Sequence, residues 1–262
     1  MKLIKALSSL NKRKKFYKLK TLTKRQINLK MRITHADVWK RKPYERNSFN
    51  SDEIYLALPS LNKKKIKKVI DIACGNGLGV SLPLLKEGYD VYSFDKWKAS
   101  IKALEKNAHK EGFKLRARIS DMYKKFPYKS SFFDASFCFQ AIYHGTLPQI
   151  ESTLKEIKRV TRRGGYFFGT FLPYYIKKEK GRNYFNYTMK NGRIGRIYVK
   201  PDKKDMFLCY NLSKKCEYMV PHYHFTKENL NTILKKYFKD ISIKKITRPD
   251  KCIYVWFIRC KI

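Results

Sequence analysis

A glycine-rich segment, Asp71-Ile-Ala-Cys-Gly75-Asn-Gly77-Leu-Gly79, is the first sign of a binding site in this chain. Residues without a Cβ atom let the backbone pass close to a ligand, and they tolerate positive φ angles. The spacing argues against a dinucleotide fingerprint, GxGxxG, because that pattern from Gly75 needs glycine where the chain has Val80. The segment therefore indicates a ligand-binding turn of another kind, with a bare tight turn as the alternative.

Acidic residues end or follow the next two segments that we predict to be strands. Asp95 ends VYSFD, and Asp121 follows KLRARIS. A carboxylate in such a place can accept hydrogen bonds from two hydroxyl groups, while a solvated acid or a turn cap remains the alternative. Lys96 and Trp97 come directly after Asp95, and Trp97 either stacks on a planar ligand or packs on the surface.

Histidines mark the other chemistry that the sequence offers. His144 follows the run FDASFCF and is the best candidate for a general base, with Gln140 and Tyr143 as orienting neighbours, although a structural histidine is the alternative. His222 and His224 alternate in PHYHF, so they point the same way along an extended segment and are candidates to face a substrate. Two histidines without a third ligand do not indicate a metal site.

Alternating strand and helix patterns position these residues. Apolar runs rich in β-branched and aromatic residues predict strands, and longer amphipathic stretches predict helices. The predicted strands cover 68–74, 91–95, 114–120, 132–139, 164–171, 241–246 and 252–260, and the predicted helices cover a short segment from 53, then 78–87, 98–112, 149–163 and 226–238. Strands that alternate with helices predict an α/β fold: a doubly wound, mostly parallel sheet of seven strands that ends in an antiparallel hairpin.

Two segments depart from this rhythm. Residues 1–36 hold 12 basic residues and no acidic one, and we interpret them as a basic N-terminal arm, disordered or helical. Residues 37–262 then form one domain. Within it, residues 173–221 lack a core-sized apolar run, so we expect a lid-like insertion that covers the carboxyl end of the sheet.

The order of these motifs resembles the class I S-adenosylmethionine-dependent methyltransferases. The family's first motif reads apolar-apolar-Asp-apolar-Gly-Cys-Gly-x-Gly, and here Ala73 replaces its first glycine. KEIKRVTRRGGYFFGTF resembles the family's helix-turn-strand, with Arg163 where proline is usual. The resemblance covers residues 65–172 most strongly.

The resemblance implies a Rossmann-like fold, S-adenosylmethionine as cofactor, and a set of roles. Asp95 would bind the two ribose hydroxyls, Lys96 and Trp97 would lie at the adenine side, and Asp121 with Met122 would meet the adenine ring. The implied cofactor residues are Asp71, Ala73, Gly75, Gly77, Asp95, Lys96, Trp97, Asp121, Met122 and Phe139. Gln140, Tyr143 and His144 would be the catalytic set, and His222 and His224 would face the substrate.

Charge leaves the methyl acceptor open. The chain has 60 Lys or Arg residues against 21 Asp or Glu, a formal net charge of +39, while 43% hydrophobic residues exclude wholesale disorder. A small-molecule acceptor fits the single compact domain. An RNA acceptor, bound through the basic arm and the insertion, is the alternative. A non-catalytic binding protein on the same fold is a third hypothesis, against which the intact cofactor motifs argue.

Cysteine usage and hydropathy bear on location. The six cysteines form no CxxC pair, so a disulfide framework is not indicated and a reducing compartment is the simplest interpretation. No apolar run is long enough to predict a membrane span. We expect a cytoplasmic protein, with an organelle transit segment at residues 1–30 as the weaker alternative. The sequence does not determine the oligomeric state.

Overall fold

The computed structural model describes residues 53–61, 66–173, 184–188, 194–198, 206–208, 221–248 and 253–262. The basic arm at 1–36 lies outside these ranges, as does most of the predicted insertion at 173–221. The arm, the insertion and the lid role given to it therefore stay predictions.

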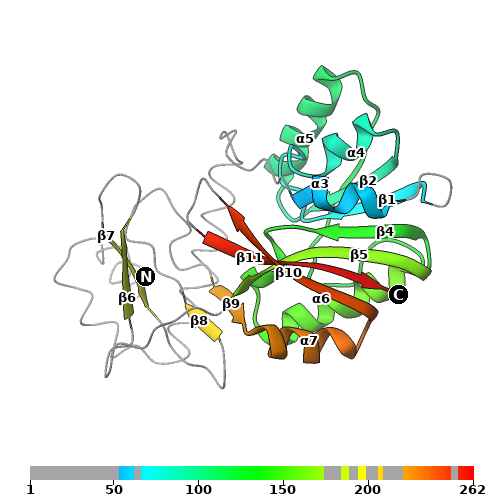
Figure 1. Cartoon of the computed structure of the whole chain (residues 1–262). Helices are drawn as coiled ribbons and strands as arrows, with labels where there is room; N and C mark the ends of the chain where they lie inside the picture. The colour runs from blue at the N-terminus through cyan, green and yellow to red at the C-terminus, as the bar shows by residue number, and fades with distance from the viewer. Residues whose placement is uncertain are drawn as a thin grey trace, which may run out of the picture.

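A twisted sheet of seven strands in the order β3-β2-β1-β4-β5-β11-β10 forms the centre of the protein (Figure 1). Its strands are β1 (Lys68–Ile72), β2 (Asp90–Asp95), β3 (Arg116–Ile119), β4 (Phe133–Cys138), β5 (Thr161–Pro173), β10 (Lys239–Arg248) and β11 (Ile253–Lys261). Strands β1 to β5 are parallel to one another, whereas β11 pairs antiparallel with both β5 and β10. The predicted α/β class, the seven strands and the C-terminal antiparallel hairpin are confirmed.

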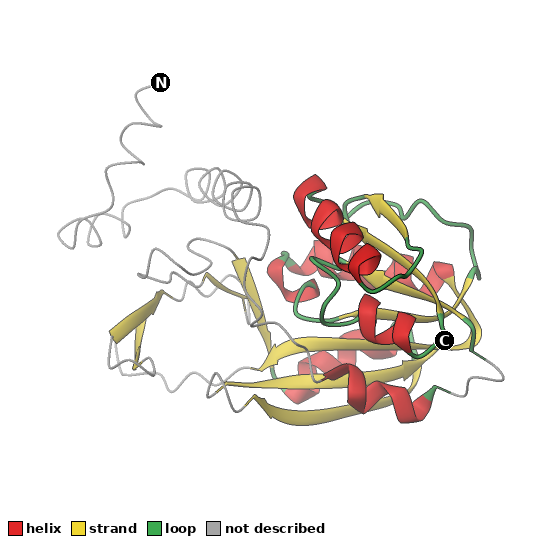
Figure 2. Cartoon of the chain, turned by 90° about the horizontal axis from the view of Figure 1, so that it is seen from above, coloured by secondary structure: helices red, strands yellow, loops and turns green. Residues whose placement is uncertain are grey.

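Helices cover both faces of this sheet, as the view from above shows (Figure 2). They are α3 (Glu53–Ala57), α4 (Ser81–Lys86), α5 (Lys98–Lys110), α6 (Leu147–Val160) and α7 (Lys227–Lys235), with short 3-10 turns η2 (Leu58–Ser60) and η3 (Ile142–His144). Helices α6 and α7 lie on one side of the sheet, and α3 and α4 lie on the other (Figure 1).

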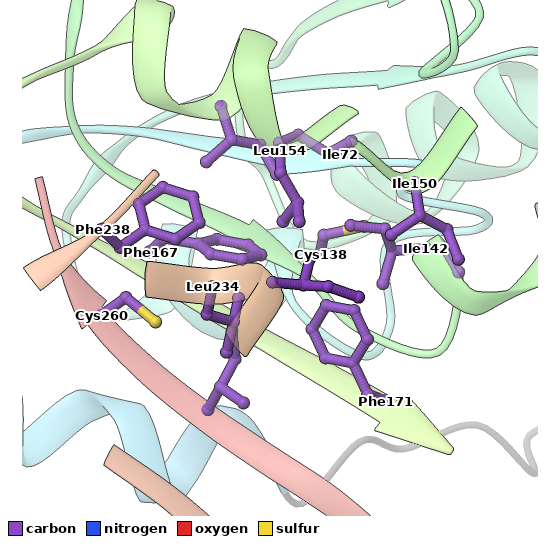
Figure 3. Close-up of a cluster of buried hydrophobic side chains, with 14 of the residues drawn as sticks. Ile72, Cys138, Ile142, Ile150, Leu154, Phe167, Phe171, Leu234, Phe238 and Cys260 are labelled. Atoms are coloured by element: carbon purple, nitrogen blue, oxygen red, sulfur yellow. The ribbon is translucent and has the colours of Figure 1, made fainter. Parts of the chain in front are cut away.

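Alternating side chains along the strands fill two cores, one on each face. Phe167 and Phe168 are neighbours in β5, yet Phe167 belongs to the core beneath α6 and α7 while Phe168 belongs to the core beneath α3 and α4. Figure 3 shows the first core, in which Leu154 of α6 and Leu234 of α7 converge on Phe167. All three are fully buried. This two-sided burial explains why the strands read as continuous apolar runs rather than as alternating ones.

The structure moves some predicted boundaries. Helix α4 begins at Ser81 and not at 78, because the glycine-rich turn extends through Val80, whose backbone is not helical. Strand β5 begins before the predicted 164, and its pairing with β4 shifts register there. Gly164 accommodates that irregularity with φ 76°, and its N–H donates to the Ile262 carbonyl at 2.9 Å.

Part of the insertion is described as short strands. Strands β6 (Tyr184–Thr188) and β7 (Ile194–Tyr198) form a hairpin, and β8 (Met206–Leu208) pairs antiparallel with β9 (Pro221–Phe225). Strand β9 in turn pairs in parallel with the end of β5. None of the helices within the described ranges is long and apolar enough to cross a membrane.

Candidate functional site

A pocket lies at the carboxyl ends of β1, β2, β3 and β4, where the loops that follow these strands meet. Most of the residues predicted to bind a cofactor line it: Asp71, Ala73, Gly75, Asp95, Lys96, Trp97, Asp121, Met122 and Phe139. Gln140, Tyr143 and His144, the predicted catalytic set, line the same pocket. The two predicted sets therefore share one cavity.

The turn after β1 forms the floor of this pocket. Ala73, Gly75 and Gly77 have φ angles of 57°, 56° and 75°, all in the left-handed region that favours glycine. The Cys74 N–H donates to the Phe94 carbonyl at 3.0 Å, which ties the turn to the end of β2. Ala73 adopts this conformation despite its Cβ atom, at a cost of about 1 kcal/mol.

Gly77 has a packing role and does not line the pocket. A Cβ atom added there would lie 2.1 Å from Leu104 Cδ1, in the middle of α5. Glycine at this position therefore lets α5 pack directly against the turn. The cofactor contact predicted for Gly77 stays a prediction, and the structure adds that this position packs against a helix.

Asp71 is the most buried carboxyl group of the site, at 2% exposure. Its Oδ2 accepts a hydrogen bond from Ser81 Oγ at 2.5 Å, and Ser81 Oγ lies 2.8 Å from Ser93 Oγ. Burial raises the pKa of Asp71 to about 7, and the hydrogen bonds from Ser81 oppose this rise only in part. The group therefore titrates near neutral pH beside the pocket.

Asp95 joins the loops that follow β1 and β2. Its Oδ2 accepts from the Gly75 N–H at 3.0 Å, and its Oδ1 accepts from the Trp97 N–H at 2.9 Å. Burial raises the pKa of Asp95, while backbone hydrogen bonds from Gly75, Lys96 and Trp97 and one from the Ser100 side chain act in the opposite direction. These donors match the roughly four acceptor positions of a carboxylate, so a ligand hydroxyl would share a position with one of them or displace it.

Asp121 lies across the pocket rim from Lys96. The Lys96 Nζ is 3.0 Å from Asp121 Oδ2, and Asp121 Oδ1 accepts from the Tyr123 N–H at 3.0 Å. The Lys96 ammonium also lies 5.7 Å from the centre of the Trp97 ring, within range of a cation–π contact. These contacts link the loop after β2 to the loop after β3.

Gln140 has a strained backbone where β4 ends. Its φ angle is 55°, uncommon for a residue with a long side chain. Two contacts hold it there. The Gln140 N–H donates to Thr170 Oγ1 of β5 at 2.7 Å, and the Gln140 carbonyl lies 3.2 Å from His144 Nε2.

His144 is 6% exposed and its ring contacts the Tyr143 ring, with centroids 4.6 Å apart. Because a carbonyl oxygen can only accept, Nε2 donates to Gln140, so in the neutral ring Nδ1 is the nitrogen that can take up a proton. The strained turn therefore fixes the tautomer of the candidate base.

His224 does not line the pocket. Its Nδ1 lies 2.9 Å from the Pro173 carbonyl, in the pairing of β9 with β5. The side chain of His222 lies outside the described residues. Among the residues that the structure describes, no group of three His, Cys, Asp or Glu side chains could hold a metal ion.

Sequence reasoning missed several residues that line the pocket, among them Cys74, Asn76, Ser100, Ser120 and Tyr123. Tyr123 follows Asp121 and Met122 directly, so its place in the chain was the signal that could have found it. Burial raises the pKa of the Cys74 and Cys138 thiols, which keeps both protonated.

Comparison with known proteins identifies the domain. Residues 70–169 match a family model described as a methyltransferase domain. This chain contains an S-adenosylmethionine-dependent methyltransferase domain. The cofactor of this methyltransferase is S-adenosylmethionine. The matched residues run from β1 to the middle of β5, so they include every loop that lines the pocket.

Solved structures share the methyltransferase fold at low sequence identity. An S-adenosylmethionine-dependent methyltransferase from Methanosarcina mazei matches with a TM-score of 0.60 and 18% identity over 79% of this chain and 97% of that one. The 1,6-didemethyltoxoflavin-N1-methyltransferase of Burkholderia thailandensis, with its acceptor and S-adenosylhomocysteine bound, matches with 0.57 and 14% over 81% and 79%. Magnesium protoporphyrin IX methyltransferase from Synechocystis matches with 0.53 and 12% over 87% and 89%. No curated protein matches the chain by sequence.

Proposed function

We propose that this methyltransferase transfers a methyl group to a small-molecule acceptor that binds at the Gln140, Tyr143 and His144 end of the pocket. The observation that carries the proposal is that these three residues share one cavity with Asp71, Asp95 and Asp121. Donor and acceptor bound in the same cavity would meet at the carboxyl edge of the sheet. The bound molecules named for the structural neighbours, a didemethyltoxoflavin among them, are small molecules.

The residues present fit the cofactor. The left-handed turn at Ala73 and Gly75 brings backbone to the pocket surface, and the Asp95 carboxylate beside it is a hydrogen-bond acceptor of the kind that ligand hydroxyl groups need. Asp95 would hold the ribose, and Asp121 with Met122 would hold the adenine. When bound, S-adenosylmethionine supplies a methyl group on a sulfonium, and it leaves as a neutral thioether.

The chain's own contribution is then orientation and control of one proton. Holding two reactants in near-attack geometry accounts for roughly 7 to 11 kcal/mol of a barrier. The Thr170 and His144 contacts fix Gln140, and the contact with His144 leaves its Nδ1 as the proton acceptor for an acceptor hydroxyl or amine. Aromatic Phe139 and Tyr143 exclude water from that end of the pocket.

Calorimetry followed by label transfer tests the proposal. Wild-type protein should bind S-adenosylmethionine at one site, and Asp95→Ala should weaken binding at least about tenfold, because a charge-assisted pair of hydrogen bonds is lost. Methyl-labelled donor is then incubated separately with metabolite, RNA and protein extracts. Label in the metabolite pool supports the proposal. No binding at millimolar cofactor would contradict it.

RNA is the second candidate acceptor, favoured by the net charge of +39 and the acid-free segment 1–36. In that case label enters the RNA pool, and affinity for RNA falls steeply with salt. Removal of residues 1–34 would lower RNA affinity and leave cofactor binding intact. If RNA binds but receives no label, RNA is not the methyl acceptor, and the net positive charge only attracts it electrostatically.

A further inference from the structure

The Tyr123 hydroxyl is buried without a hydrogen-bond partner among the residues that the structure describes, although the side chain lines the pocket. Leaving a buried hydroxyl unpaired costs about 1 to 3 kcal/mol, so such a group in a binding site points to a partner that arrives with the ligand. The methyltransferase motifs assign no role to this residue.

The surroundings of Tyr123 hold it in one place. Its N–H donates to Asp121 Oδ1 at 3.0 Å, which fixes the backbone at the end of the loop after β3. A Cβ atom added to Gly145 would lie 2.9 Å from Tyr123 Cε1 and 3.0 Å from its hydroxyl oxygen. The ring therefore packs directly on the backbone of Gly145, and the pocket is the side from which a ligand can approach.

The hydroxyl acts as a donor at neutral pH. Burial, together with the nearby Cys138 and Asp121, raises the pKa of Tyr123 well above its usual value. A protonated phenol needs an acceptor atom. Adenine ring nitrogens and ribose oxygens are acceptors, and Asp121 and Met122, the two residues before Tyr123, are those proposed to hold the adenine ring.

We propose that the Tyr123 hydroxyl donates a hydrogen bond to the adenosine half of the bound cofactor and so acts as a cofactor-binding residue. This rests on the proposed use of the pocket, with Asp121 at its adenine end. Because the hydroxyl has no solvent exposure before binding, the ligand must part the side chains that close over it. Binding then removes the penalty of the unpaired group.

Tyr123→Phe tests this with two readouts that move in opposite directions. Affinity for S-adenosylmethionine, S-adenosylhomocysteine and 5′-methylthioadenosine, measured by calorimetry, should fall about three- to tenfold, the range expected for one neutral hydrogen bond. The melting temperature without ligand should stay equal or rise by about 2 °C, because an unpaired buried hydroxyl has been removed. 5′-Methylthioadenosine is included because it contains the adenosine half of the cofactor without the amino-acid half.

Tyr128→Phe is the matched control. The Tyr128 hydroxyl is also buried without a partner among the described residues, but this side chain packs among Tyr92, Phe132 and Phe133 and does not line the pocket. Removing the Tyr128 hydroxyl should affect the melting temperature in the same way as Tyr123→Phe does. It should leave the affinities for S-adenosylmethionine, S-adenosylhomocysteine and 5′-methylthioadenosine unchanged. The control therefore separates relief of an unpaired group from loss of a ligand contact.

Gly145→Ala gives an independent arm, because the added methyl group displaces the Tyr123 ring. It should weaken binding of the same three ligands, and its effect should shrink in the Tyr123→Phe background if both act through the hydroxyl.

Three results overturn the inference. They are unchanged affinity in Tyr123→Phe, a loss for S-adenosylmethionine that spares 5′-methylthioadenosine, and a lower melting temperature that reveals a protein partner for the hydroxyl. If wild-type protein binds none of the three ligands, the proposed function fails first, and this inference fails with it.

Discussion

Asp71→Asn should make the protein more stable above neutral pH, because it removes the penalty of ionising a buried carboxyl group. The pKa of Asp71 is about 7 in the folded protein, against an ordinary value of 3.8. At a pH between these two values, Asp71 keeps its proton in the folded protein and has lost it in the unfolded chain. The free energy of unfolding of the wild type therefore falls as the pH rises from about 4 to 7. The Asp71→Asn variant does not show this fall, because asparagine does not ionise.

The size of the effect follows from the same two pKa values. The free-energy cost that the buried Asp71 carboxyl group imposes on folding can be expressed in pKa units. For the wild type this cost is about 1.2 units at pH 5 and about 3 units at pH 8. The difference is about 2 units, or roughly 3 kcal/mol at 1.36 kcal/mol for each unit. The asparagine side chain of the Asp71→Asn variant keeps an acceptor for Ser81 Oγ, so this hydrogen bond survives the substitution at every pH.

Urea unfolding followed by tryptophan fluorescence, at pH 5, 6, 7 and 8 without cofactor, measures this effect. The free energy of unfolding of Asp71→Asn, relative to wild type, should rise by roughly 3 kcal/mol across the series. Asp240→Asn, at a side chain that is 70% exposed, is the control for replacing an aspartate at a position that is not buried. A relative stability that does not change with pH, or falls, would refute the assignment of a raised pKa to Asp71.

Three further predictions concern the walls of the pocket. Gly77→Ala should lower the free energy of unfolding by about 2 kcal/mol or more, measured by chemical denaturation, because its Cβ atom meets Leu104 at 2.1 Å and φ is 75°. A fully stable variant would contradict this packing. Thr170→Val should cost about 1 kcal/mol and slow methyl transfer while cofactor affinity stays unchanged, because the bond that holds Gln140 is lost; Thr170→Ser should restore both. Asp95→Asn should weaken cofactor binding in calorimetry without lowering the melting temperature by more than about 4 °C, and equal binding would exclude a role for its charge.

The fold was predictable because its signals are local and repeated. Strands β1, β2, β4 and β5 read as largely apolar runs between amphipathic stretches, so their order in the chain follows from the pattern. Strand β3 lies at the sheet edge, is largely exposed and alternates apolar with basic residues. The positions of Asp95 and Asp121 at strand ends also follow, because parallel strands deliver their carboxyl ends to one edge of the sheet.

Contacts between distant segments were not predictable from the sequence. Thr170 lies 30 residues from Gln140, and their hydrogen bond depends on the register of β4 against β5. The packing of Gly77 against Leu104 is a contact that the glycine pattern did not indicate. The contact of His224 with the Pro173 carbonyl likewise depends on the pairing of β9 with β5, which alternation within one segment does not reveal.

The chain as a whole has a net charge of +39, but the residues that line the pocket differ from this overall composition. Asp71, Asp95 and Asp121 line the cavity, and Lys96 is the one Lys or Arg in the lining that the structure describes. Lys96 forms an ion pair with Asp121, so its charge is neutralised and does not repel a sulfonium-bearing ligand. Such a ligand carries positive charge and gains nothing from a basic surface. These acids therefore suit a cationic ligand, and the excess of basic residues that gives the net charge lies outside the described lining of the pocket.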